Sequence, residues 1–194
     1  MSDEISEKLS INLIYDNIAL METDAIVNAA NTELKRGSGV CGAIFKAAGR
    51  RELQSACDKL APIRTGEAVI TPGFRLKAKY IIHTAGPRYQ GGTNNEESLL
   101  RECYVNSLKL AKQNGCKSIA FPIISAGHYG YPPQEAFDTA VSAIQGFLGD
   151  SNADISVYLS LYGFNTKTMA RKIFLALDDL CTRKFIFKKN GGAL

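Results

Sequence analysis

The sequence lacks several patterns that point to common classes of protein. Its five cysteines are odd in number and never form a C-x-x-C pair, which argues against a zinc site and a disulfide framework. No apolar run approaches the roughly 18 residues of a membrane span, and the opening stretch MSDEISEKLSIN has no apolar signal-peptide core. We therefore expect a cytoplasmic protein that needs no metal ion or other cofactor and contacts no membrane.

A strong excess of one charge is also missing. The chain has 23 Lys and Arg residues against 19 Asp and Glu residues, a formal net charge of +4. No basic block is long enough to act as a nucleic-acid arm, so we do not expect nucleic acid as a partner. A mildly positive surface suits a small anionic ligand. With 194 residues and no internal repeat or linker, we expect a single domain over residues 1–194, with its core at about 10–180.

Short apolar runs alternate with stretches of helical spacing along the chain. Apolar residues at helical spacing predict helices that begin near Val40 and cover about 99–111, 136–148 and 169–177. This alternation predicts an α/β fold, with a largely parallel or mixed sheet and helices on both faces. Residues 183–194 are either an edge strand with a flexible end or a flexible tail alone. The β-branched runs predict buried strands at 9–15, 25–30, 67–73, 80–86, 118–124 and 155–163.

A glycine-rich loop, NTELKRGSGVCG, follows the strand that ends near Asn28. In sheets of this kind, ligands bind beyond the carboxyl ends of strands, where loops lead into helices. Gly37, Ser38, Gly39 and Gly42 allow close approach of the backbone, so N–H groups can point at a phosphate beside a helix N-terminus. The alternative is that these glycines only make a tight turn.

Two asparagines, Asn28 and Asn31, lie at the end of the same strand. Amide groups are costly to bury unless they are paired, and each offers a donor and an acceptor that suit ribose hydroxyl groups. Asn28 either braces the neighbouring backbone, which we favour, or binds the ligand. Asn31 is the stronger ligand candidate.

A second loop of similar character, ISAGHYGYPPQ at residues 124–134, follows the strand at 118–124. Its glycines offer another cradle of N–H groups with tyrosine walls, ahead of a helix that its prolines help to start. Two such loops across one groove suit a diphosphate, although two ordinary turns have the same composition. In a third loop, LYGFNTK, Tyr162 and Phe164 either stack on a purine or pack in the core.

Together, the segments DAIVNAAN, GSGVCGAIFKAAG, IIHTAGPRYQGG and SIAFPIISAGHYGYP resemble those of macro domains, the ADP-ribose-binding modules. The resemblance extends from about residue 10 to about residue 180. It implies a three-layer α/β/α sandwich around a mixed six- or seven-stranded sheet, with ADP-ribose in a cleft at the crest of that sheet. The implied partner is ADP-ribose or an ADP-ribosylated protein.

The resemblance also implies ligand-binding roles for the matching positions. The aspartate of the family's G-D-I-T motif, which accepts a hydrogen bond from adenine, matches Asn17, and the helping backbone N–H matches Ile18. An amide oxygen can still accept that bond without a charge. Asn31 matches the asparagine that faces the distal ribose, the one not attached to adenine. The two phosphate loops match Ser38, Gly39 and Val40, and Ser125, Ala126, Gly127, His128 and Tyr129, with Tyr129 beside the distal ribose.

Cys41 is the main departure from the family pattern. Members that hydrolyse O-acetyl-ADP-ribose, or remove ADP-ribose from acidic side chains, commonly read G-G-V-D where this chain reads GSGVC. A neutral thiol is a poor substitute for a carboxylate that accepts a proton, although other active members also lack that aspartate. Beside a helix N-terminus, the Cys41 thiol is either a nucleophile with a lowered pKa or a small apolar residue. His128 is a candidate general base, and His83 a hydrogen-bonded core residue.

The residues and the resemblance leave an enzyme and a reader as alternatives. The enzyme, which we favour, would hydrolyse an ester-type linkage at the distal ribose of an ADP-ribosylated protein or an O-acyl-ADP-ribose, with catalytic roles for Asn31, Cys41 and His128. The reader would bind ADP-ribose without turnover, and the thiol at Cys41 favours it.

Overall fold

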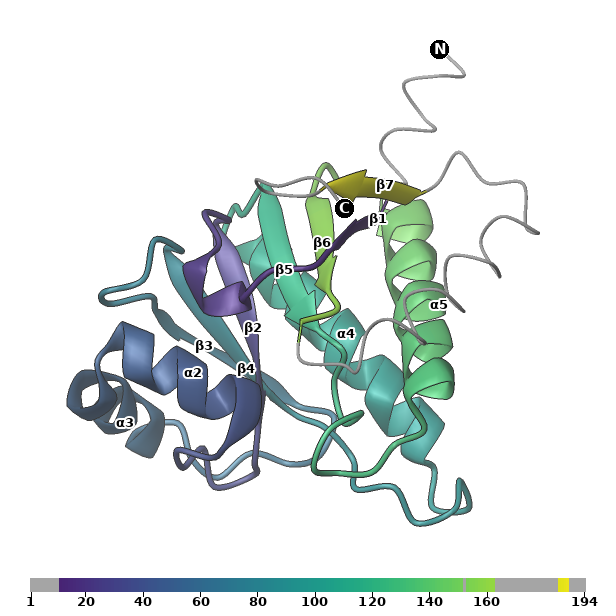
Figure 1. The fold of residues 1–194 in the computed structure, drawn as a ribbon, viewed down its shortest axis with the longest axis horizontal. Coiled ribbons are helices and arrows are strands. Elements are labelled where there is room, and N and C mark those ends of the chain that lie inside the picture. Colours follow the sequence, from purple (N-terminus) through teal and green to yellow (C-terminus); the bar gives the residue numbers. More distant parts are fainter. Residues whose placement is uncertain (1–10, 152, 163–184, 189–194) are drawn as a thin grey trace.

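A seven-stranded sheet forms the middle of the molecule, and helices cover both of its faces (Figure 1). This computed structural model describes residues 11–151, 153–162 and 185–188. The strand order is β3-β4-β2-β5-β6-β1-β7. The strands are β1 (Ile11–Ile14), β2 (Ala25–Ala30), β3 (Ala68–Pro72), β4 (Tyr80–Ala85), β5 (Ser118–Pro122), β6 (Ser156–Ser160) and β7 (Phe185–Lys188).

The sheet is mixed because one edge strand runs against the others. β3 pairs with β4 in the antiparallel direction, whereas β2 pairs in parallel with β4 and β5, and β1 pairs in parallel with β6 and β7. β5 and β6 are also parallel. The mixed α/β sheet predicted from the sequence is therefore confirmed.

Two pairs of helices give the fold its outer layers. α2 (Gly39–Ala48) and α3 (Arg50–Asp58) cover one face, and α4 (Glu96–Gln113) and α5 (Pro133–Ser151) cover the other (Figure 1). Separate apolar clusters lie under the two pairs, with Ile26, Ile44 and Phe45 in one and Ile82, Leu108 and Ile144 in the other. None of the helices in the described ranges combines the length and apolar character that a membrane span requires.

Some elements differ from the sequence-based expectation. The short 3-10 helix η1 (Ile18–Leu20) and the helix α3 were not predicted. α3 buries only Leu53 and Cys57, and two buried positions are too few to give a clear helical stripe. β7 lies beside β1 at the sheet edge, in the tail for which a strand was one of two alternatives. The helix predicted at 169–177 lies outside the described residues.

Parallel strands place their following loops at one edge of the sheet. The loops after β2, β4 and β5 all lie at the lower edge in Figure 1. These are residues 31–38, 86–95 and 123–132, and two of them are the glycine-rich loops in which phosphate contacts are predicted.

Candidate functional site

The two glycine-rich loops meet at the lower edge of the sheet. The Ser38 hydroxyl oxygen lies 3.4 Å from Nε2 of His128, and both side chains are exposed. Gly39 has a φ of +56°, and a Cβ added there would lie 4.0 Å from Nδ1 of His128. The half-buried Val40 and Ala126 pack against the apolar clusters of opposite faces. The two glycine-rich loops therefore contact each other at this edge of the sheet.

The first loop is closed by its own hydrogen bonds. The Gly37 N–H donates to Sγ of Cys41 at 3.3 Å, and the Gly42 N–H donates to the Ser38 carbonyl at 3.2 Å. A Cβ on Gly42 would lie 2.9 Å from the Gly37 carbonyl oxygen, so the turn requires glycine there. Ser38 is the N-cap of α2 but its side chain caps no N–H group. The N–H groups of the first turn are therefore open to an anion.

Asn31 braces this loop from its other end. Its Nδ2 donates to the Lys35 carbonyl at 2.8 Å, and its Oδ1 accepts the Lys35 N–H at 3.0 Å. Lys35 in turn forms an ion pair of 2.6 Å with Asp58. An amide has a second N–H and a second lone pair, so Asn31 keeps one donor and one acceptor for another partner.

Asn28 lies beneath the loop in a buried polar cluster. It has 0% exposure, and its Nδ2 lies 3.0 Å from Nδ1 of His83. The other ring nitrogen, Nε2, lies 3.0 Å from the hydroxyl of Thr71. Since the amide donates to Nδ1, Nε2 carries the proton and donates to Thr71. The structure thus corrects the expectation for Asn28, which bonds a side chain rather than backbone and has no surface to offer a ligand.

The cluster makes His83 a neutral core histidine. Its side chain is fully buried, and burial lowers the pKa of His83 to about 4. The expectation of a hydrogen-bonded core residue is met by its contacts with Asn28 and Thr71. Cys57 lies in the same cluster with Sγ 3.9 Å from Nε2, and burial raises the pKa of Cys57 to about 12.

Cys41 lies between the loop and this cluster. It is only 4% exposed, and burial raises the pKa of its thiol despite the opposing Gly37 N–H, Asn28 amide and Arg36 charge. This raised pKa contradicts the lowered pKa that a nucleophilic role of Cys41 assumes, and the catalytic role itself stays a prediction. The neutral thiol instead accepts a hydrogen bond from the loop and fills an apolar space.

The second loop is anchored to α4 and to its own turn. The hydroxyl of Tyr104 accepts the Ile124 N–H at 3.0 Å, and the Tyr131 N–H donates to the Ser125 carbonyl at 3.1 Å. Ser125 has a φ of +64°, and its buried hydroxyl has no partner among the described residues. No atom lies within 4 Å of a Cβ added at Gly127, so that position borders open space.

A third loop, residues 86–95, packs against the second and was not assigned a role from the sequence. The Tyr89 N–H donates to the Tyr129 carbonyl at 2.9 Å. The guanidinium of Arg88 lies over the Tyr129 ring, 4.5 Å from its centroid. The sequence feature that could have indicated a role for this loop is the segment GPRYQGG at residues 86–92, which begins at the end of the predicted strand at 80–86.

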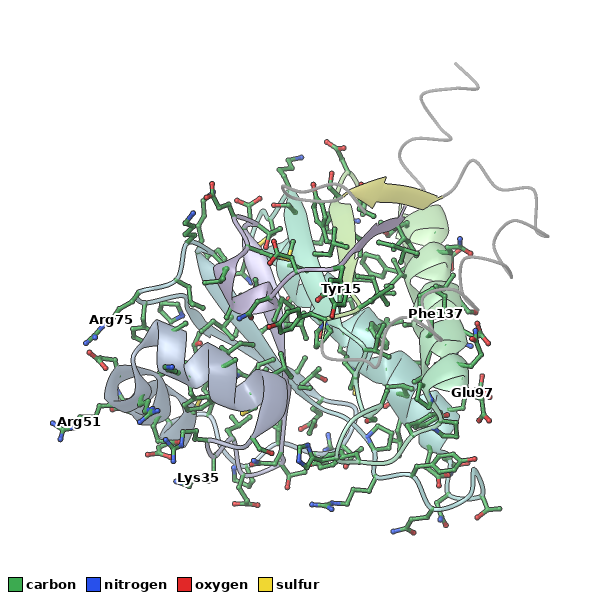
Figure 2. All side chains as sticks on the ribbon, in the orientation of Figure 1. Tyr15, Lys35, Arg51, Arg75, Glu97 and Phe137 are labelled. Atoms are coloured by element: carbon green, nitrogen blue, oxygen red, sulfur yellow. The ribbon has the colours of Figure 1, made fainter. Side chains whose placement is uncertain are left out.

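The residues predicted near adenine lie at the ends of β1 and β6. Oδ1 of Asn17 accepts the N–H two residues further on at 3.1 Å and so caps η1, while the Ile18 side chain is buried. Tyr162 is 56% exposed, and its ring lies 5.7 Å from that of Tyr15, near the centre of Figure 2. Phe164 lies outside the described residues.

Two further observations bear on ligands. In the described ranges, no three His, Cys, Asp or Glu side chains are placed to hold a metal ion. A hollow beside η1 contains none of the predicted ligand residues and is lined by Ile14, Asp16, Met21, Glu22, Thr23, Ser118 and Tyr158.

Comparison with known proteins decides the family. The family model for the Macro domain matches residues 27–140, a segment that begins within β2 and includes α2, both glycine-rich loops and β5. The chain belongs to the macro domain family. An O-acetyl-ADP-ribose deacetylase of Citrobacter rodentium is 43% identical over 173 residues, which cover 87% of this macro domain and 97% of the relative.

Solved macrodomains share the fold. The macrodomain of Oceanobacillus iheyensis, solved with ADP, has a TM-score of 0.78 and 38% identity, over 87% of this chain and 92% of that one. The Trypanosoma brucei macrodomain in complex with ADP-ribose has a TM-score of 0.73 and 35% identity, over 84% and 68% of the two chains. The three-layer α/β/α sandwich implied by the resemblance is thereby confirmed.

Proposed function

We propose that this macro domain binds ADP-ribose or an ADP-ribose derivative in the groove between its glycine-rich loops. The observation that supports the proposal is the approach of Ser38 to His128 at 3.4 Å, which brings the two glycine-rich turns together. The macrodomain of Trypanosoma brucei, with the same fold, was solved in complex with ADP-ribose.

The proposed ligand lies along the crest of the sheet. The open N–H groups near Gly39 and Gly127 hold the diphosphate, because helix N-termini and exposed turns attract anions. The distal ribose lies against Asn31 and Tyr129. The adenine lies toward Asn17 and Tyr162, at the ends of β1 and β6.

The proposed reaction is hydrolysis of an ester-type linkage at the distal ribose. Water adds to the ester, the bond to the ribose oxygen breaks, and the products are a carboxylic acid and a ribose hydroxyl group. The spare donor and acceptor of Asn31 orient the ribose, and the ligand's own phosphate holds the water. His128 is the candidate group for proton transfer. The name of the Citrobacter rodentium relative, O-acetyl-ADP-ribose deacetylase, supports this reaction class.

A non-catalytic reader is the second candidate. The buried, neutral thiol of Cys41 favours it, because a thiol with a raised pKa is a poor acceptor for a proton from water. In this version the same groove recognises free or protein-linked ADP-ribose without turnover.

A calorimetric titration with ADP-ribose, ADP and AMP tests the groove. We expect ADP-ribose to bind more tightly than ADP, because ADP lacks the distal ribose. AMP should bind least tightly, because it also lacks the second phosphate. Equal affinity for all three would contradict the ribose roles of Asn31 and Tyr129.

A turnover assay separates the enzyme from the reader. Incubation with a protein carrying aspartate- or glutamate-linked ADP-ribose is expected to release ADP-ribose above a control without protein. Cys41→Asp is the matched variant, and its carboxylate is expected to raise the rate by about tenfold or more. Tight ADP-ribose binding without release by the unmodified chain would leave only the reader.

A further inference from the structure

The three loops at this edge of the sheet carry more positive than negative charge. Residues 31–46, 86–95 and 123–134 contain one acidic residue, the exposed Glu33, although the chain has 19 acidic residues. Their cations are Lys35, Arg36, Lys46 and Arg88. Lys46 lies in the last turn of α2, away from the meeting point of the loops. The remaining three cations outnumber that single carboxylate, so these loops carry a net positive charge.

Two of these cations are free to bind something else. Lys35 is paired with Asp58 at 2.6 Å, so its charge is offset locally. Arg36 and Arg88 are both exposed, and among the described ion pairs neither has a partner. Arg36 directly precedes the loop glycine whose N–H bonds Cys41, and its charge acts on that thiol. Both arginines therefore lie on loops that border the proposed binding site.

Arg88 has a contact that orients it without a partner. Its guanidinium carbon lies over the Tyr129 ring, and the neighbouring Tyr89 N–H donates to the Tyr129 carbonyl. Further along the loop, the buried carboxylate of Glu96 accepts the N–H groups of Gln90 and Gly92 at 3.0 and 3.3 Å. A guanidinium that lies over a ring face keeps N–H groups available for a carboxylate.

The position of Arg88 indicates the class of partner. In the proposed function, on which this inference rests, the distal ribose lies beside Tyr129, so the linked protein leaves the groove past that ring. We propose that Arg88 and Arg36 bind acidic side chains of the ADP-ribosylated protein, next to the residue that carries the modification. The groove recognises the nucleotide, and the arginines select modification sites that lie in acidic segments.

The alternative is that the two arginines bind the diphosphate of ADP-ribose instead of the linked protein. In that case, loss of Arg88 would weaken free ADP-ribose as much as a peptide that carries it. The two uses therefore differ in whether the charge of the peptide matters.

The test compares peptides that differ only in charge. Two peptides carry ADP-ribose on one side chain through a non-hydrolysable linkage, with that residue flanked by Asp and Glu in one and by Asn and Gln in the other. Their affinities, and that of free ADP-ribose, are measured for the unmodified chain, for Arg88→Ala and for Arg36→Ala. Arg51→Ala is the control, since Arg51 is exposed on α3 and points away from the loops at the left of Figure 2.

The expected result is a charge preference that depends on the two arginines. The unmodified chain should bind the acidic peptide about three- to tenfold more tightly than the neutral one. Each cleft variant should lower that ratio by about two- to fivefold, and Arg51→Ala should leave it unchanged. The preference should also shrink as salt is raised from about 0.05 M to about 0.5 M.

Each other outcome counts against a specific step. Equal affinity of the unmodified chain for both peptides overturns the inference while the proposed function stands. A parallel loss of free ADP-ribose and both peptides in Arg88→Ala assigns Arg88 to the nucleotide and also overturns it. Failure of the unmodified chain to bind free ADP-ribose removes the proposed function itself.

Discussion

The residues around the proposed binding site are of two kinds. Some lie at the surface of the molecule, and others lie buried beneath that surface. Asn31, Ser38 and His128 are at the surface, whereas Asn28 and His83 lie in the buried polar cluster with Thr71. The sequence predicted the right strand end for both asparagines. It could not show that Asn28 bonds His83, because a contact between two strands depends on their register, which only the folded sheet fixes.

His83 links this cluster to pH. Its folded-state pKa of about 4 lies below the ordinary value of 6.5, so the unfolded chain binds the proton more readily. The neutral His83 therefore contributes fully to the free energy of unfolding above pH 6.5, and this contribution is lost as the pH falls toward the folded-state pKa. Between pH 7 and pH 5 the unmodified chain should lose about 2 kcal/mol more unfolding free energy than His83→Gln. Urea unfolding at the two pH values measures the difference, and identical losses would contradict a buried neutral imidazole.

At the level of secondary-structure elements, the start of α2 is the part most constrained by local geometry. The glycine pattern predicted a phosphate loop ahead of a helix, and α2 begins at Gly39, beside the predicted start at Val40. The pattern did not show that Cys41 accepts the Gly37 N–H, because that bond forms within the folded turn.

Gly42→Ala tests this turn. The added methyl group would lie 2.9 Å from the Gly37 carbonyl oxygen, so the loop must shift and its N–H groups turn away from the ligand. We expect ADP-ribose affinity in calorimetry to fall by about tenfold, the equivalent of one lost hydrogen bond.

Gly146→Ala in α5 is the matched control for that change. Nothing lies within 4 Å of a Cβ at Gly146, and helix interiors favour alanine over glycine by about 0.5–1 kcal/mol. This variant should bind ADP-ribose normally and unfold at slightly higher urea concentration. Unchanged affinity in Gly42→Ala would mean that the turn does not hold the ligand.

Over the whole molecule, the alternation of apolar runs and helical stripes was enough to predict the class of fold. This alternation could not predict the direction of β3, because an edge strand of that length fits either orientation until it pairs with β4. The sequence pattern also could not predict that Arg88 lies over Tyr129, since the two residues are distant in the sequence and meet only where their loops pack.

One sheet separates both apolar clusters, so the chain is expected to unfold as a unit. A ligand that bridges loops from both halves should then stabilise the entire fold. At about 100 times its dissociation constant, ADP-ribose should add about 2.7 kcal/mol and raise the Tm by about 5–10 °C in a single thermal transition. Two separate transitions, only one of which responds to ADP-ribose, would contradict a single cooperative domain.

The Glu96 carboxylate gathers backbone N–H groups of the loop that carries Arg88, and it does so without using that loop's side chains. The exposed side chain of Thr93, for example, is therefore not needed to hold the loop in place. This stretch is accordingly a natural place to attach a fluorescent reporter beside the groove, or for related chains to diversify their contacts while the architecture stays intact.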